Sequence, residues 1–171
     1  MTAELVEMFK WNAWANQKYR EALSTIPYED LFIDTPYGRL IDRIVHIFAS
    51  FKMWHQRMEG ESPDSVISVD DFSNWEELAA VWQQYDELLI EYVSTISSDK
   101  VASRVTYTSL DGSIYTRTIR HILLHLTAHP NYHRGQISAI FKLKQLGKLP
   151  STDMVVYYLD QGIDIRTLPD E

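Results

Sequence analysis

The sequence predicts an all-α protein: a four-helix bundle with a long crossover connection and a small β-hairpin before the last helix. Four long stretches carry apolar residues at helical spacing. A polar stretch of about fourteen residues separates the second from the third, which is longer than a tight helical hairpin needs. An Asp-Gly pair between two β-prone runs precedes the fourth stretch. The 171 residues suffice for one full core, so we expect a single domain over residues 1–171.

The first helix is predicted over residues 2–24, where apolar residues recur every three or four positions. Trp11, Asn12, Trp14 and Asn16 give it an aromatic and amide-rich face. Buried amides in a bundle are usually hydrogen-bonded within the packing. We therefore expect these residues to hold the bundle together rather than to bind a ligand.

The second helix is predicted over residues 39–59 and carries His46 and His55. On a helical wheel with Ile44 at zero, His55 lies about 20° from the centre of the apolar stripe, and His46 lies about 160° away. Periodicity alone therefore favours His55 as the histidine that faces the core.

The following segments supply the crossover, a third helix, the hairpin and a fourth helix. Residues 60–73 form a polar connection that we expect to cross the end of the bundle. The third helix is predicted over residues 74–97, the hairpin near residues 104–116 and the fourth helix over residues 116–147. Pro130 lies inside the fourth helix, and we expect a kink rather than a break because the apolar stripe keeps its phase across it.

Four of the six histidines lie in the fourth helix, each four residues after the last. With Leu126 at zero on the wheel, His133 lies at about 20°, His129 at about 60°, His125 at about 100° and His121 at about 140°. The pair closest to the apolar stripe is therefore His129 and His133. Such a pair can share one metal ion inside a bundle, and two core histidines bonded to the backbone are the alternative.

Composition and charge exclude several functional classes. No apolar run approaches the roughly 20 residues that a membrane-spanning helix needs, and no signal or transit peptide follows Met1. We therefore expect a cytoplasmic protein that does not bind a membrane. The net charge of −8, without a basic run, argues against nucleic acid as a partner. The chain has no cysteine, so any thiol chemistry must use a thiol that comes with the substrate.

Three motifs carry a resemblance to a known family. The first is the run Trp-Asn-Ala-Trp-Ala-Asn at residues 11–16, and the second is His46-Ile47 with Trp54 eight residues after the histidine. The third is the block His-x-x-x-His-x-x-x-His-Arg-Gly-Gln at residues 125–136. Over nearly the whole chain, the sequence resembles the DinB/YfiT-like family of metal-binding four-helix-bundle proteins.

The resemblance implies a metal site with three histidine ligands, His46, His129 and His133. His46 enters this set only through the resemblance, against the helical wheel, so His55 remains the alternative ligand. Ligation by three imidazoles suits Zn, Ni, Fe or Mn and leaves a fourth position for water or a thiol.

Three further residues near these histidines are candidates for supporting roles. Gln136, one turn after His133, either orients His129 or a bound ligand, or faces solvent. His125 either contacts a ligand histidine or lies on the surface. Arg134 is expected to form an ion pair with an acidic residue of a neighbouring helix rather than to contact a substrate.

The resemblance leaves two functions open. Characterised relatives include thiol-dependent transferases and isomerases, so one interpretation is an enzyme in which a divalent metal activates a low-molecular-weight thiol, or water, for transfer to or hydrolysis of a small-molecule substrate. The other is a non-catalytic, stress-induced bundle with a structural metal or a partner-binding surface. The sequence assigns no catalytic residue. A homodimer is expected from the aromatic and apolar character of the first two helices and from the resemblance.

Overall fold

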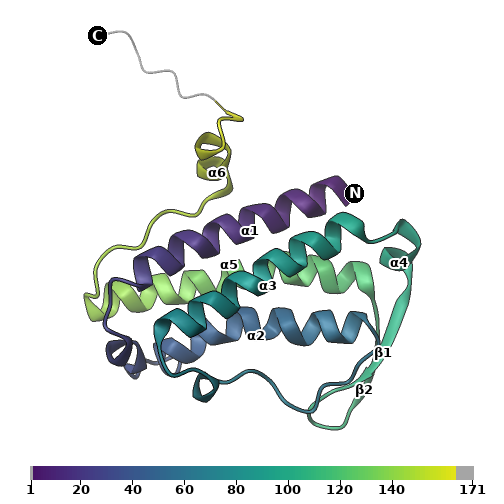
Figure 1. The fold of residues 1–171 in the computed structure, drawn as a ribbon, viewed down its shortest axis with the longest axis horizontal. Coiled ribbons are helices and arrows are strands. Elements are labelled where there is room, and N and C mark those ends of the chain that lie inside the picture. Colours follow the sequence, from purple (N-terminus) through teal and green to yellow (C-terminus); the bar gives the residue numbers. More distant parts are fainter. Residues whose placement is uncertain (1, 165–171) are drawn as a thin grey trace.

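Four long helices form a bundle in the computed structural model, which describes residues 2–164 (Figure 1). They are α1 (Thr2–Leu23), α2 (Leu40–Met58), α3 (Trp75–Thr95) and α5 (Ile119–Lys144). The all-α class and the four long helices predicted from periodicity are confirmed, with boundaries shifted by at most three residues. Within residues 2–164, none of the helices has the length and apolar character needed to span a membrane.

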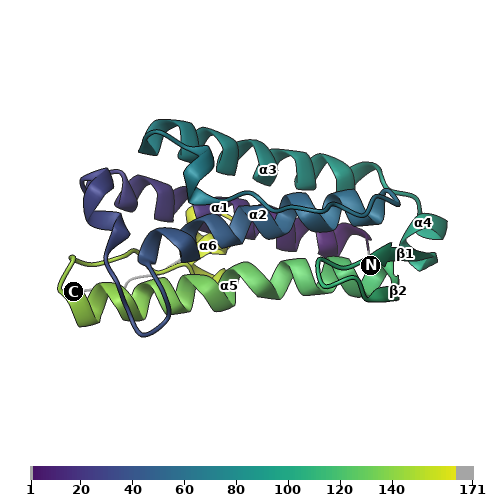
Figure 2. The ribbon, with the colours of Figure 1, turned by 90° about the horizontal axis from the view of Figure 1, so that it is seen from below.

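The order of the helices around the bundle places α2 beside α5. Helix α1 packs against α3 and α5, and α2 packs against the same two helices. Figures 1 and 2 show that α2 and α3 run in the same direction, so the chain between them returns along the length of the bundle. This segment is the predicted crossover connection, but it runs along the bundle rather than across its end as expected. It contains a short 3-10 helix, η2 (Val69–Asp71), which the Ser68 side chain caps.

The core is filled by aliphatic and aromatic side chains from all four long helices. Phe48 of α2 stacks on Trp82 of α3, with ring centroids 5.9 Å apart. Ile44, which marked the centre of the predicted stripe of α2, is fully buried. Helix α5 runs without interruption through Pro130, so the helix does not break there. It ends at Lys144 instead of Gly147, because Gln145 adopts a left-handed conformation with φ of 55° and caps it.

The hairpin consists of β1 (Arg104–Thr108) and β2 (Ile114–Thr118), paired antiparallel. It extends two residues further than predicted and leads directly into α5. Tyr107 is buried and packs edge-on against Trp54 of α2, which fixes the hairpin on the bundle. A short helix that the sequence analysis did not predict, α4 (Ser98–Ala102), connects α3 to β1 and is capped by Ser97.

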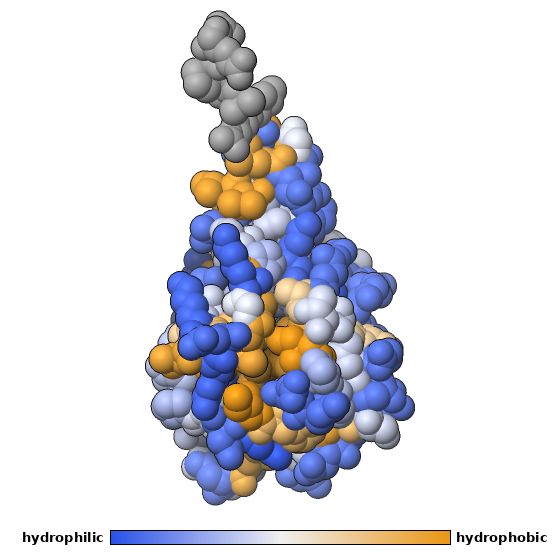
Figure 3. Space-filling view, turned by 90° about the vertical axis from the view of Figure 1, so that its left-hand side faces the viewer, coloured by the Kyte–Doolittle hydropathy of each residue, from blue (hydrophilic) through white to orange (hydrophobic). Residues whose placement is uncertain are grey.

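Two further short elements flank the bundle. The 3-10 helix η1 (Tyr28–Phe32) follows α1, and α6 (Met154–Asp160) follows α5. Helix α6 lies beside α1 at one edge of the molecule (Figure 1). Trp14 Nε1 of α1 donates a hydrogen bond to Asp160 Oδ2 of α6 over 2.7 Å. Figure 3 shows apolar surface in the upper part of the molecule, where α6 lies. Val155 and Leu159 of α6, and Ile163 just after it, are exposed apolar residues.

Candidate metal centre

Three histidines converge where α2 and α5 face each other. His46 comes from α2, and His129 and His133 come from successive turns of α5. The Nε2 atom of His129 lies 3.1 Å from Nε2 of His46 and 3.1 Å from Nε2 of His133. One ring nitrogen from each residue lies within 4.8 Å of the others, and among the described residues this group contains these three side chains alone.

Exposure along α5 follows the helical wheel. His133 is 5% exposed and His129 is half-buried, whereas His125 and His121 are exposed. The wheel also placed His46 correctly, because that residue is exposed on the flank of α2. The three histidines therefore lie at the edge of the α2–α5 contact, where the flank of one helix meets the flank of the other.

His55 is not part of this group. It is half-buried near the C-terminal end of α2, where its ring packs edge-on against Tyr92 of α3 at 5.0 Å. The wheel placed His55 toward the core, and its ring indeed lies against a neighbouring helix, but that helix is α3. The structure thus brings His46, and not His55, to His129 and His133.

Hydrogen bonds select the tautomers of two of the three imidazoles. Ser50 donates its hydroxyl proton to the Ile47 carbonyl over 2.7 Å, so its oxygen accepts from Nδ1 of His129, 3.2 Å away. The Gln136 Oε1 atom accepts from Nδ1 of His133 over 2.8 Å. With the proton on Nδ1, each ring keeps the lone pair on Nε2, and these lone pairs face one another.

The protonation equilibria favour neutral rings. Burial and the neighbouring His133 lower the pKa of His46 to about 4, because its Nε2 edge is turned into the contact with α5. Burial and the same neighbour lower the pKa of His129 to about 3. Burial also lowers the pKa of His133, opposed by its bond to Gln136. Neutral imidazole is the form that binds a metal ion, so the group is ready for ligation at neutral pH.

The spacing of the ring nitrogens fits a metal ion. Two imidazole nitrogens bound to a tetrahedral Zn²⁺ at about 2.05 Å lie about 3.3 Å apart. The two separations of 3.1 Å are close to that value. The lone pairs of His129 and His133 point at each other without a proton between them and therefore repel, and a cation between them removes this repulsion. The residues present therefore fit a three-histidine divalent metal site.

A cavity of about 470 Å³ lies beside the histidines and gives access to them. His46 and His129 form part of its wall. The other walls come from α2, from the crossover connection and from Leu110 at the tip of the hairpin. Its volume falls within the range of small-molecule sites. The three histidines thus border a space that a small ligand can enter.

Several neighbours of this site were missed or only partly anticipated. Gln136 binds His133 rather than His129, and the sequence analysis gave Ser50 no role. Ser50 lies one turn after His46, so the four-residue spacing could have indicated it. His125 is exposed and still contacts the site, with ring centroids 5.0 Å from His129 and 5.6 Å from Trp54.

A buried polar network holds α5 against α1 next to the histidines. Arg134, which is 1% exposed, donates to Asn16 Oδ1 over 2.7 Å and to Asn12 Oδ1 over 2.9 Å. Asn12 also donates to the carbonyl of Thr127 over 2.9 Å. The expected ion pair of Arg134 is thus replaced by bonds to two amides. Because Arg134 directly follows His133, these bonds fix the rotation of α5 that turns His133 toward α2.

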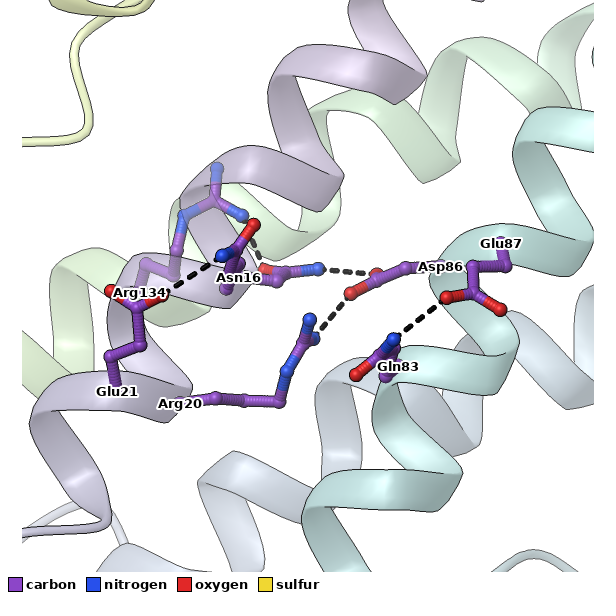
Figure 4. Close-up of polar contacts among 8 residues, drawn as sticks. Asn16, Arg20, Glu21, Gln83, Asp86, Glu87 and Arg134 are labelled. Atoms are coloured by element: carbon purple, nitrogen blue, oxygen red, sulfur yellow. Dashed lines mark hydrogen bonds and ion pairs between the residues drawn. The ribbon is translucent and has the colours of Figure 1, made fainter. Parts of the chain in front are cut away.

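The network continues from α1 to α3 (Figure 4). Asn16 donates to Asp86 Oδ1 over 2.7 Å, and Arg20 reaches the other oxygen of that carboxylate over 2.5 Å. Burial raises the pKa of Asp86 to about 7, and the charge of Arg20 opposes the shift. The amides of α1 and Arg134 of α5 therefore belong to one hydrogen-bonded network, which also reaches α3.

The fold and the site define a class: a four-helix bundle with a crossover connection and a histidine cluster between its second and last long helices. The model of the DinB family matches residues 1–164. The chain belongs to the DinB family, which confirms the resemblance in its motifs.

Known relatives have the same size and fold. Protein DinB from Bacillus subtilis (strain 168) is 20% identical over 158 residues, which cover 88% of this chain and 91% of that protein. A DinB-like protein from Bacillus cereus ATCC 10987 superposes with a TM-score of 0.66 at 13% identity, covering 86% of this chain and 94% of that one. The DinB-like protein YjoA of Bacillus subtilis gives 0.63 at 15% identity, covering 88% and 98%.

Proposed function

We propose that the protein binds one divalent metal ion through the Nε2 atoms of His46, His129 and His133, and that it is a metal-dependent enzyme. The observation that carries this proposal is the convergence of three neutral ring nitrogens, two of which have their tautomers set by Ser50 and Gln136. A divalent ion with an open coordination position supplies one function, lowering the pKa of a thiol or water so that it becomes a nucleophile near neutral pH.

The protein's own groups then orient the reactants. The cavity beside the histidines admits a small-molecule substrate, and its largely apolar lining favours an apolar body on that substrate. Because the chain has no cysteine, a thiol nucleophile must come with a low-molecular-weight thiol co-substrate. Transfer of that thiol to an electrophile, or hydrolysis by water, is the reaction class that this arrangement supports.

Elemental analysis of untagged protein purified without added metal tests the site. We expect about one ion per chain, Zn, Ni, Fe or Mn, since imidazole ligation does not select among them. His133→Ala and His46→Ala should lose the ion, because each removes one of three ligands. His55→Ala and His121→Ala are the matched controls and should keep it. If His55→Ala empties the site while His46→Ala does not, the assignment of the third ligand is wrong.

A structural metal is the second candidate, because the three histidines come from two helices and an ion there would join α2 to α5. The two roles differ in whether the fourth coordination position exchanges ligands. Cobalt-substituted protein titrated with a low-molecular-weight thiol should develop a thiolate charge-transfer band if the metal activates thiols. An unchanged spectrum would favour the structural role.

A further inference from the structure

Arg57 of α2 is a buried cation without a carboxylate partner among the described residues. It is 5% exposed, and its guanidinium packs against the rings of both Trp54 and Tyr107, at 4.8 Å and 4.3 Å from their centroids. Its buried Nε atom has no hydrogen-bond partner. Arginine stays charged inside proteins, and cation–π contacts compensate only part of its lost hydration. Arg57 thus retains an unmatched positive charge and a free hydrogen-bond donor.

A second arginine lies beside the first. Arg117 donates from Nε to the hydroxyl of Tyr107 over 3.1 Å. Burial is the main cause that lowers the pKa of Arg57, and the positive charge of Arg117 lowers it further. The chain as a whole carries a net charge of −8. Two arginines that share one tyrosine therefore form a local positive region that an anion would neutralise.

Arg57 and the histidine cluster border the same cavity. His46, Ser50, Met53 and Arg57 are spaced at four, three and four residues along one face of α2, and all of them line the cavity. From His46 to Arg57 the helix axis advances by about 16 Å. The arginine therefore stands about three helical turns from the histidines, at the far end of the same cavity.

The wall between these two ends is apolar. It is formed by aliphatic side chains of α2, the crossover and the hairpin tip: Val45, Ala49, Met53, Val66, Ile67, Val69 and Leu110. One carboxylate, that of Asp42, also lines the cavity, but Arg39 binds both of its oxygens at 2.8 and 2.9 Å. The cavity thus offers an unneutralised cation at one end, an apolar middle and the histidines at the other end.

We propose that this cavity binds an amphiphilic anion, whose charged group bonds to Arg57 and whose apolar body extends along α2 to the histidine cluster. This inference names the class of ligand that the proposed metal enzyme would bind. It rests on the proposed function only for the part of the ligand that lies beside the histidines. A carboxylate, sulfonate or phosphate supplies the acceptors that a guanidinium edge binds in pairs. An aliphatic chain matches the middle of the cavity.

Isothermal titration calorimetry with octanoate and 1-octanol tests the proposal, on zinc-loaded protein and on protein stripped of metal with EDTA. Octanoate should bind the wild type, and Arg57→Met should weaken it by roughly tenfold or more through loss of a charge-assisted bond. The binding of 1-octanol should be the same in both proteins. Arg104→Met removes an exposed arginine of the hairpin and should leave octanoate binding unchanged.

Two more variants keep the test decisive if Arg57→Met does not fold. Arg57→Lys keeps the charge without the planar donor edge and should weaken octanoate by a smaller factor. Ala49→Phe fills the apolar middle and should abolish binding of both probes. Equal affinity of octanoate in the wild type and the Arg57 variants, or no binding of octanoate at all, would overturn the proposal.

The metal-free measurement separates this inference from the proposed function. If the protein takes up no metal but binds octanoate in a way that depends on Arg57, the anion site is supported and the proposed metal enzyme is refuted. The opposite result is one metal ion bound per chain with an octanoate affinity that does not change in the Arg57 variants. That result would support the metal site and refute the anion site.

Discussion

Replacing Asn16 with leucine is the sharpest test of the buried network that positions the histidines. Asn16 accepts a hydrogen bond from the Arg134 guanidinium and donates one to the Asp86 carboxylate. A hydrogen bond to a charged group contributes about 1.5–3 kcal/mol, so the loss of both should destabilise the fold by about 3–6 kcal/mol. Domains are typically stable by only about 5–15 kcal/mol, so this change is a large fraction of the total.

The matched control lies one residue further along α1. Gln17 is exposed, and its amide bonds to Glu21 one turn later. Gln17→Leu also exchanges an amide for an aliphatic side chain, but it should cost only about 0.2–0.5 kcal/mol, as for other exposed pairs on one helix face.

Urea unfolding followed by far-UV circular dichroism measures both variants. The midpoint of Asn16→Leu should fall well below that of Gln17→Leu, with an unchanged slope. Zinc affinity of Asn16→Leu should also fall, because Arg134 adjoins His133. If Asn16→Leu is no less stable than Gln17→Leu, the network does not stabilise the bundle and the argument is refuted.

Four further predictions concern the site and the surface. Gln136→Leu should lower zinc affinity by about 10- to 100-fold in a chelator competition, because His133 loses the acceptor that sets its tautomer, and an unchanged affinity would contradict this. Zinc affinity should hold to a pH below 6.5, where an ordinary imidazole titrates, because burial lowers the pKa of all three histidines, to about 4 for His46 and about 3 for His129, and a midpoint near 6.5 would count against these shifts. The metal-free protein should instead lose stability as pH falls from 6.5 toward 4, because the unfolded chain binds the extra protons, and urea midpoints that do not move would contradict this. Light scattering should give twice the 20.0 kDa of one chain, with the exposed apolar side chains of α6 as the candidate contact, and a mass of one chain would remove the dimer.

Local pattern was enough for most of the fold. The long helices follow from apolar periodicity, and the hairpin follows from the Asp-Gly pair, because both signals act between residues close in sequence. Helices α4 and α6 were not predicted as helices, since elements of five and seven residues are too short to show a period. The C-terminal end of α5 was predicted too late, because Gln145 rather than a glycine adopts the left-handed cap.

By itself, the sequence determined that His129 and His133 share one face of one helix, since four residues make about one turn. Only the tertiary structure decided which residue of α2 joins them. A helical wheel finds the side of α2 with the most apolar surface, and His55 on that side meets Tyr92 of α3. Helix α5 packs against α2 as well, and the exposed His46 at the edge of that contact faces the histidines of α5. That choice depends on how helices distant in sequence are arranged, which no periodicity within a single helix encodes.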